Sequence, residues 1–476
     1  MRRHPTAPPA VGWIARTLEE AGFETWAVGG AVRDVLVGIP SVDWDLATRA
    51  RPRDVRRLFR RTVPIGVRHG TVGVLARDGT LYEVTTFRRD VKTFGRHATV
   101  EFADTVREDL SRRDFTINAI AWHPLRDELF DPFGGVEDLE SGVLRTVGEA
   151  RQRLAEDYLR VLRALRFAGR FSLEIDPATW RALQEATSRL DVLSRERVRE
   201  ELLKVLGADP APERALRLYR ASGVLAAVLP ELDRTAEVGL PEGPPGLDAW
   251  SYGVELAAIL PPTRPLLRLA ALLQGVGIPD GGGEAAEARD APEPLSPGSA
   301  DPTAETRARW RTRRAVHRAA GLLLRRRFSN ADVERVTSLL AAGPAPPSAE
   351  AGGAALRRWL SRVGAERLRD VARLWVARAR VLARRGHGDP RDVVAAWRAL
   401  RRELDRRPPL TVGDLALGGK DLIRMGMKPG PHFGRVLEGL LERVLDDPRL
   451  NDAETLAGLV REEWQGRSDV RGEGRG

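Results

Sequence analysis

Two aspartates separated by one residue, Asp43 and Asp45 in VDWDLAT, have a spacing that suggests chemistry. In a β-strand, side chains two residues apart point to the same face, so these carboxylates would lie side by side. Like charges this close repel each other unless a cation lies between them, and oxygen ligands with open coordination positions suit Mg2+. Because an isolated Asp-x-Asp is more often a surface turn, the metal hypothesis depends on the surrounding residues.

A glycine pair upstream of the aspartates adds a second feature. Gly29 and Gly30 follow the apolar run WAV and precede AVRDVLVG, which predicts a strand, a tight turn and a helix. Backbone N–H groups at such a turn can face an anion, and Arg33 follows one helical turn later. These residues predict a phosphate site beside the carboxylates. Glu83, in the predicted strand LYEVTTF, could add a third carboxylate or form a salt bridge, and the sequence leaves both open.

Charged residues recur at every third position of RLAEDYLRVLRALRFAGRF, residues 153–171. They are Asp157, Arg160, Arg163 and Arg166. On a predicted helix this row would turn by roughly 60° per step and climb roughly 13 Å, about the length of a nucleotide. A charged row is usually a solvated face, but the interleaved leucines place this one beside a buried surface.

The hydrophobic pattern divides the chain into an α+β head and a long helical remainder. The first ~145 residues mix strand and helix signals, whereas amphipathic helices dominate after about residue 150. We predict a head followed by an all-α neck, body and tail, at residues 1–145, 146–207, 208–340 and 354–468. Residues 280–305 are rich in Gly, Pro, Ala and acidic residues, which predicts a disordered insertion.

The composition excludes some classes of protein. The chain of 476 residues has no cysteine, which excludes disulfides and thiolate chemistry. No apolar run reaches the ~20 residues that span a bilayer, and no signal-peptide pattern follows MRRHPTAPPA, so we expect a cytoplasmic protein without a membrane partner. The net charge of +10 comes mainly from arginine, and genome composition explains it about as well as a polyanionic partner does.

Several segments together resemble one family, the class II tRNA nucleotidyltransferases (CCA-adding enzymes) and bacterial poly(A) polymerases. GGAVRD with VDWDLAT resembles the first family signature. The later signatures resemble, in order, SRRDFTINAIAW (111–122), DPFGGVEDLESGVLRTVG (131–148), residues 153–171 and RERVREELLKVL (195–206). The segment GGKDLIRMGMKPGPHFGRVLEGLLERVLDDP resembles the tail of bacterial CCA-adding enzymes. The resemblance implies a nucleotidyltransferase head with a polymerase β-like mixed sheet.

The resemblance also implies an activity. The protein would add CCA, or part of it, to the tRNA 3′ end from CTP and ATP without a nucleic-acid template, releasing pyrophosphate. Asp43 and Asp45 would be catalytic and would hold two Mg2+ ions. Asp157 and Arg160 would read the Watson–Crick edge of the base, where C and A both carry an amine. The implied nucleotide-binding residues are Gly29, Gly30, Arg33, Arg113, Asp114, Asp157, Arg160, Arg163 and Arg166.

Other features bear on the alternatives. In the family that the chain resembles, enzymes that add only CC tend to have a shortened segment between VTTFR and RRDF. Here that segment is full length and contains Gly95, Arg96 and His97, although Phe94 replaces the acidic residue that the family usually has before them. The resemblance therefore favours complete CCA addition, or addition of A alone by an enzyme that shares CCA synthesis with a second enzyme. The sequence EDYLR lacks the proline of the EDPxR found in poly(A) polymerases, which favours the tRNA enzyme. A poly(A) polymerase and a catalytically inactive RNA-binding homologue are the alternatives. The sequence does not indicate an oligomeric state.

Residues 248–279 resemble the start of an HD phosphohydrolase-type domain. In that domain a histidine and a His-Asp pair hold a metal. Here Tyr252 stands at the first position and Gln274-Gly275 at the pair, and His317 alone cannot build the site. We therefore predict an HD-like helical fold without phosphohydrolase activity.

Overall fold

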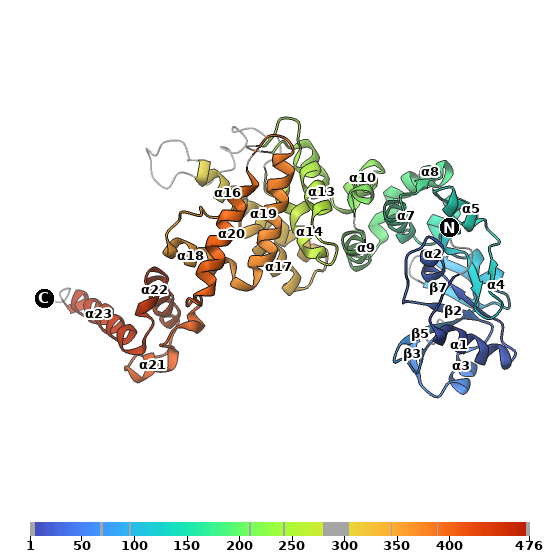
Figure 1. Ribbon diagram of the computed structural model, residues 1–476, viewed down its shortest axis with the longest axis horizontal. Helices are drawn as coiled ribbons and strands as arrows, with labels where there is room; N and C mark the ends of the chain where they lie inside the picture. Colours follow the sequence, from blue (N-terminus) through green and yellow to red (C-terminus); the bar gives the residue numbers. More distant parts are fainter. Residues whose placement is uncertain are drawn as a thin grey trace. The chain divides into compact units, whose positions relative to one another are not determined.

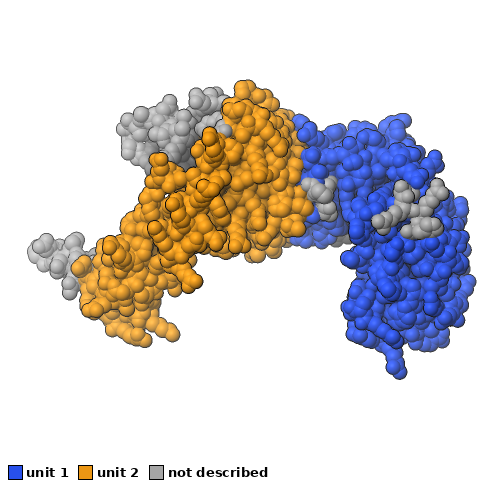
Figure 2. Space-filling model, in the orientation of Figure 1, with its two compact units in different colours: residues 1–233 blue, residues 234–476 orange. Residues whose placement is uncertain are grey.

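The computed structural model describes residues 5–66, 70–94, 97–208, 211–240, 243–278, 304–343, 345–387 and 389–472, with only the backbone at 90–94, 97–100, 208, 304–309 and 463–472. The chain forms two compact units, residues 1–233 and 234–476 (Figures 1 and 2). The finer division predicted from the sequence stays a prediction. The predicted insertion lies almost wholly outside the described residues, as do Gly95 and Arg96.

A seven-stranded mixed sheet in the order β3-β4-β5-β2-β1-β8-β9 forms the centre of unit 1. Its strands are β1 (Thr25–Val28), β2 (Asp45–Thr48), β3 (Thr62–Gly66), β4 (Thr71–Leu75), β5 (Leu81–Thr86), β8 (Ala121–His123) and β9 (Glu128–Phe130). β2 and β5 are parallel, and the other neighbouring strands are antiparallel. Two smaller pairs lie outside this sheet: β6 (Arg88–Phe94) with β7 (His97–Phe102), and β10 (Val143–Leu144) with β11 (Glu174–Ile175).

The strands give the sheet two different faces. Along β5, Glu83 is exposed while its neighbours Tyr82 and Val84 are buried, as expected for side chains that alternate across a sheet. The helices α1 (Pro9–Glu20) and α3 (Pro52–Leu58) contact each other and pack on strands of this sheet (Figure 1). Three short helices complete the head: α2 (Gly30–Leu36), α4 (Val106–Ser111) and α5 (Gly135–Glu140).

Helices make up most of the rest of unit 1. They are α6 (Ala150–Glu156), α7 (Leu159–Arg170), α8 (Pro177–Ala186), α9 (Arg195–Ala208), α10 (Glu213–Ala221), α11 (Val224–Val228) and α12 (Pro230–Asp233). The prediction that Asp157 lies on the same helix as Arg160 is wrong. Asp157 is extended, with φ −154° and ψ 105°, and separates α6 from α7. Its carboxylate accepts the backbone N–H of Leu159 at 3.1 Å, and this local bond competes with continuation of the helix.

Unit 2 is helical in the part that the structure describes, which confirms the predicted fold class. Its α-helices are α13 (Ala249–Ile259), α14 (Pro265–Leu272), α16 (Ala304–Arg325), α17 (Asn330–Ala341), α18 (Gly353–Val363), α19 (Leu368–Ala383), α20 (Pro390–Asp405), α21 (Gly419–Arg424), α22 (His432–Asp446) and α23 (Ala453–Gly472). Among the described helices, none combines the length and the apolar character that a bilayer span requires.

A buried arginine of unit 2 contacts the segment that we predict to be HD-like. Arg378 on α19 donates to Gln274 Oε1 at 2.7 Å and to the Gly343 carbonyl at 2.6 Å. Tyr252 is buried, which raises the pKa of its hydroxyl, and His317 is exposed on α16. Across the described residues, no group of three or more His, Cys, Asp or Glu side chains is arranged to hold a metal. The absence of phosphohydrolase activity stays a prediction.

Candidate active site

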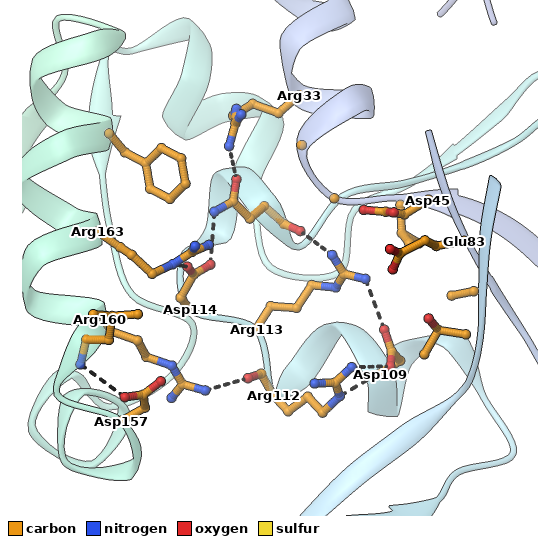
Figure 3. A pocket seen from close by; sticks show the side chains of 18 of the residues that line it. Arg33, Asp45, Glu83, Asp109, Arg112, Arg113, Asp114, Asp157, Arg160 and Arg163 are labelled. Carbon is orange, nitrogen blue, oxygen red and sulfur yellow. Dashed lines mark hydrogen bonds and ion pairs between the residues drawn. The ribbon is translucent and has the colours of Figure 1, made fainter. Parts of the chain in front are cut away.

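A cavity of about 670 Å3 in unit 1 collects most of the predicted site residues (Figure 3). Its lining includes nine arginines, namely Arg33, Arg88, Arg112, Arg113, Arg160, Arg163, Arg166, Arg170 and Arg197. It also includes five carboxylates: Asp45, Glu83, Asp109, Asp114 and Asp157. The volume suits a small ligand, and the excess of arginine favours one that carries several negative charges.

Asp45 is a carboxylate of the cavity whose surroundings oppose its ionisation. It begins β2, and in the parallel register it is paired with Glu83 on β5. Burial and the nearby charges of Asp43 and Glu83 raise the pKa of Asp45 to about 6, while Arg113 acts in the opposite direction. A cation held at this site would relieve the repulsion between the carboxylates.

Asp43 lies differently from the sequence-based expectation. It precedes β2 rather than belonging to a strand, it is exposed, and it is not among the residues that line the cavity. The same-face argument therefore does not apply to it, although its charge acts on Asp45. Within the described residues no third ligand completes a metal group. The carboxylate oxygens still fit a hard divalent cation, because Mg2+ is commonly bound by one or two carboxylates together with substrate phosphates.

The predicted glycine turn is present and lies against the charged groups. Gly29 has φ +81° and precedes α2, a conformation that favours glycine. A Cβ atom at this position would lie 3.1 Å from Arg113 Nη1 and 3.7 Å from Asp45 Oδ2. The glycine therefore allows the backbone to approach both side chains. Gly30 also lines the cavity.

Arg33 is a buried part of the cavity wall, with a side chain only 4% exposed. It donates to Asp34 Oδ1 at 2.9 and 2.6 Å and to Asn118 Oδ1. Its guanidinium also lies 4.8 Å from the ring centroid of Phe167 and 4.5 Å from that of Phe171. Arg33 thus links α2 to α7, and its predicted contact with phosphate stays a prediction.

The RRDF segment is organised around a buried carboxylate that none of the sequence motifs revealed. Asp109 on α4 accepts hydrogen bonds from Arg112 at 2.8 and 3.2 Å and from Arg113 at 3.1 Å. Burial alone would raise the pKa of Asp109, but the charges of the two arginines outweigh it and lower that pKa. Arg113 also donates to the Asn118 carbonyl at 3.3 Å. Asp109 therefore fixes both arginines in the cavity wall.

Asp114 connects the head to α7. Its carboxylate is buried and accepts from Arg163 Nε at 2.8 Å, from Asn118 Nδ2 at 2.9 Å and from the Phe115 backbone N–H at 2.9 Å. Burial opposes ionisation of Asp114, but Arg163 and the hydrogen bonds outweigh it and lower the pKa. Both Asp114 and Arg163 are thus held in place before any ligand binds.

The two residues implied in base reading line the cavity, and each has its own anchors. Asp157 accepts two hydrogen bonds from Arg197, at 3.0 and 2.6 Å. Arg160 donates to the carbonyls of Arg153 at 2.6 Å and Arg112 at 3.1 Å, and to Glu156. Arg197 lies in the segment 195–206, but no spacing rule in that segment marks it as a partner of Asp157.

Arg166 is less accessible than a phosphate ligand was expected to be. Its side chain is 8% exposed and donates to Glu201 Oε2 at 2.7 Å. Its guanidinium also lies 4.3 Å from the ring centroid of Phe167. The structure brings all the predicted residues except Asp43 into the cavity lining and shows protein partners for Arg33, Asp114 and Arg166 that the sequence did not reveal.

Comparison with known proteins gives consistent matches. Residues 25–145 match the family model described as the poly A polymerase head domain, and residues 172–235 match the one described as a probable RNA and SrmB-binding site of polymerase A. The chain is 43% identical over 221 residues to a CCA-adding enzyme of Geobacillus stearothermophilus, and 45% identical over 228 residues to one of Geobacillus thermodenitrificans. These matches cover 46% and 47% of this chain, and they span about half the length of each relative, 54% and 55%.

A solved structure matches over nearly the whole length. The crystal structure of a Bacillus stearothermophilus CCA-adding enzyme in complex with CTP aligns with a TM-score of 0.70 and 30% identity. The alignment covers 98% of this chain and 100% of that one.

Proposed function

Because the chain belongs to the class II tRNA nucleotidyltransferase family of CCA-adding enzymes and poly(A) polymerases, we propose that it adds CCA to the 3′ end of tRNA. The substrates would be CTP and ATP, and pyrophosphate would be released. A tRNA substrate and free nucleotides would place the reaction in the cytoplasm. The similar proteins carry the name CCA-adding enzyme, which supports tRNA processing over poly(A) synthesis.

One observation carries the proposal: a single arginine-lined cavity contains both the carboxylate pair and the base-reading pair. Asp45 and Glu83 lie on strands of the sheet, Asp157 lies at the break between α6 and α7, and Arg160 lies in the first turn of α7 (Figure 3). A nucleoside triphosphate has two ends of different chemistry, a polyanionic chain and a base. The arginines and a metal held by Asp45 would suit the polyanionic chain, and Asp157 with Arg160 would suit the base.

Asp45, which lines the cavity, and Asp43, which lies just before β2 and outside the lining, would hold the divalent metal, which we propose to be Mg2+. Asp43 and Asp45 supply oxygen donors, and the raised pKa of Asp45 marks repulsion that a cation relieves. Bound there, the metal would neutralise the triphosphate and favour ionisation of the primer 3′-hydroxyl. Gly29, Gly30, Arg113 and the exposed part of Arg163 would bind the triphosphate, since arginine forks match phosphate oxygens.

Asp157 and Arg160 would select the base without a nucleic-acid template. A carboxylate accepts from the exocyclic amine that C and A share, and a guanidinium donates to the adjacent ring acceptor. Each carboxylate oxygen has two lone pairs, so Asp157 can accept a base amine while Arg197 stays bound. Uracil and guanine present a carbonyl at that position and would meet the carboxylate with no proton to donate.

Primer extension tests this proposal. Purified protein with Mg2+ would be offered tRNA ending before CCA and tRNA ending in CC, with CTP, ATP or both. We expect growth by three nucleotides that then stops. An arrest after CC, or extension of the CC-ended primer only, would limit the activity to C or to A addition. A long A ladder would assign poly(A) synthesis, and no extension beside an active control enzyme would leave only an RNA-binding role.

A further inference from the structure

The head carries a second surface with the chemistry of nucleic-acid binding, on the helix layer formed by α1 and α3. Residues 49–61 contain seven arginines and one acidic residue, Asp54. Pro52, Val55 and Phe59 are buried against the head, so the arginines are directed outward. We define the α3 surface as Trp13 of α1 with Arg53, Arg56, Arg57, Arg60 and Arg61 of α3 and the segment after it.

The arginines of the α3 surface are largely uncompensated. The side chains of Arg53 and Arg57 are 87% and 73% exposed, and their nearest carboxylate, Asp54, lies 3.8 and 3.9 Å away. Asp54 instead accepts the backbone N–H of Arg51 at the start of the helix. The side chains of Arg56, Arg60 and Arg61 are exposed and form no hydrogen bond or ion pair with another described residue. Like charges three and four residues apart destabilise a short helix, so the fold alone does not account for this row.

An exposed indole lies beside these charges. Trp13 is 40% exposed, and its ring meets that of the buried Phe59 edge-to-face, with centroids 5.3 Å apart and planes at 80°. This contact holds the indole in a fixed orientation at the surface. Arginine forks bind phosphates, and an exposed aromatic ring stacks on unpaired bases. A duplex offers only the phosphates, because its bases are already stacked.

The α3 surface is separate from the cavity. Along β5, Glu83 and Thr85 line the cavity, whereas Val84 between them is buried on the other face of the sheet. The helices α1 and α3 contact β2 and β5 and also each other, so they cover that second face (Figure 1). An RNA segment on the α3 surface is therefore not the one whose 3′ end reaches the cavity.

We propose that the α3 surface binds a single-stranded RNA segment, with Trp13 stacking on a base and the arginines binding phosphates. This binding does not rest on the proposed function, because it involves none of the residues of the cavity. It would hold single-stranded RNA, whether part of a substrate or a separate molecule, at a distance from the reacting 3′ end.

Fluorescence anisotropy with a labelled, unstructured oligouridine tests the proposal. A 3′-phosphate on the oligouridine prevents its use as a primer. We expect the double variant R56E/R57E to bind at least tenfold more weakly. The slope of log K against log salt should fall by about 1.4, since each lost single-strand phosphate contact contributes about 0.7. The variant W13A should weaken binding about 5- to 100-fold, the range of one base–aromatic stack.

A matched control separates a local site from a general effect of charge. Arg181 and Arg189 are exposed arginines of the same unit, and R181E/R189E makes the same change of charge. We expect it to bind within about twofold of the wild type. Melting curves would show that each variant is folded, and the conservative W13F should retain most of the affinity that W13A loses.

Three outcomes would overturn the inference. The first is that R56E/R57E binds the oligouridine as tightly as the wild type, and the second is that R181E/R189E weakens binding as much as R56E/R57E does. The third is that polyglutamate competes as effectively as RNA and W13A leaves the affinity unchanged. The last outcome would assign the surface to an acidic protein. Primer extension measured in parallel keeps the two proposals apart. Loss of oligouridine binding with intact extension would support the α3 surface alone, and failed extension with intact binding by the wild type would count only against the proposed function.

Discussion

Replacing Asp45 by Asn should stabilise the metal-free protein while it abolishes nucleotide addition. The pKa of Asp45 is raised from 3.8 to about 6, chiefly by burial and by the charges of Asp43 and Glu83. The folded state therefore holds this proton more tightly than the unfolded chain. Below about pH 4 the group is protonated in both states and contributes nothing. As the pH rises through 4 to 6, folding increasingly requires a buried, repelled charge, so stability falls.

The size of the effect follows from the difference between the two pKa values. A pKa unit corresponds to about 1.4 kcal/mol, so the ionised Asp45 costs the folded state about 3 kcal/mol above pH 6. For a unit of 233 residues, 1 kcal/mol moves the Tm by about 2–4 °C. Asp45→Asn should therefore raise the Tm of unit 1 by about 6–12 °C.

Scanning calorimetry in EDTA at pH 8 and at pH 4.5 measures this directly. We expect the gain in Tm at pH 8 to shrink at pH 4.5, where the wild-type group is mostly protonated. Mg2+ with CTP should raise the Tm of the wild type and leave the variant unchanged. Asp109→Asn is the matched control of opposite sign. The charges of Arg112 and Arg113 lower the pKa of Asp109, so its ionised form stabilises the fold, and the variant should melt earlier at pH 8.

Equal melting temperatures for the wild type and Asp45→Asn at pH 8 without metal would refute this reasoning. A gain of the same size at both pH values would also refute it, because a change in packing, unlike a change in charge, does not depend on protonation.

Three further substitutions test other parts of the structure. Arg197→Met removes both hydrogen bonds to Asp157 and should lower kcat/KM for CTP and ATP about 10- to 100-fold in steady-state kinetics, with partial recovery in Arg197→Lys. Gly29→Ala introduces a Cβ 3.1 Å from Arg113 at φ +81° and should lower kcat at least about tenfold, whereas alanine at Gly79, whose surroundings are open, should leave kcat unchanged. Arg378→Met leaves the Gln274 and Gly343 oxygens without their hydrogen-bond donor and should lower the free energy of unfolding, measured by urea denaturation, by about 2–4 kcal/mol, with unchanged primer extension.

Each of these predictions has an outcome that contradicts it. Wild-type kcat/KM for CTP and ATP in Arg197→Met would show that Asp157 keeps its orientation without its partner. Full activity of Gly29→Ala would mean that the turn can move away from Arg113. Loss of activity in Arg378→Met at a temperature where the protein is folded would show that the contact between α19 and Gln274 has a role beyond stability.

The sequence predicted the elements that local pattern determines. The strands β1, β2 and β5 correspond to the runs WAV, VDWDLAT and LYEVTTF, and the turn at Gly29 follows from a glycine pair between a strand and a helix. Side-chain alternation predicted that Asp43 and Asp45 lie on one face of a strand, and Asp45 does begin β2. The same rule failed for Asp43 because the strand begins two residues later than expected, at a point that periodicity does not determine.

The sequence did not predict the pairing of charges inside the cavity. A row of arginines on a helix looks the same whether the side chains face solvent or meet carboxylates from other segments. Asp114 and Glu201 neutralise Arg163 and Arg166 from 49 and 35 residues away along the chain. The break at Asp157 was missed for a related reason. The leucine pattern continues through it, and only the hydrogen bonds to Leu159 and Arg197 reveal that the helix is interrupted.

Many hydrogen bonds between the head and the helices α6 and α7, a contact that we call the seam, are accepted by main-chain carbonyl oxygens. Arg160 donates to the carbonyls of Arg153 and Arg112, and Arg153 donates to those of Ser111 at 2.7 Å and Val147 at 3.0 Å. Any residue at position 111, 112 or 147 presents the same acceptor, so point mutations there can accumulate without removing these bonds. Inserting or deleting one residue in the RRDF segment would shift the carbonyls out of register together. The seam should therefore tolerate substitutions at positions 111, 112 and 147, but it should not tolerate insertions or deletions between them.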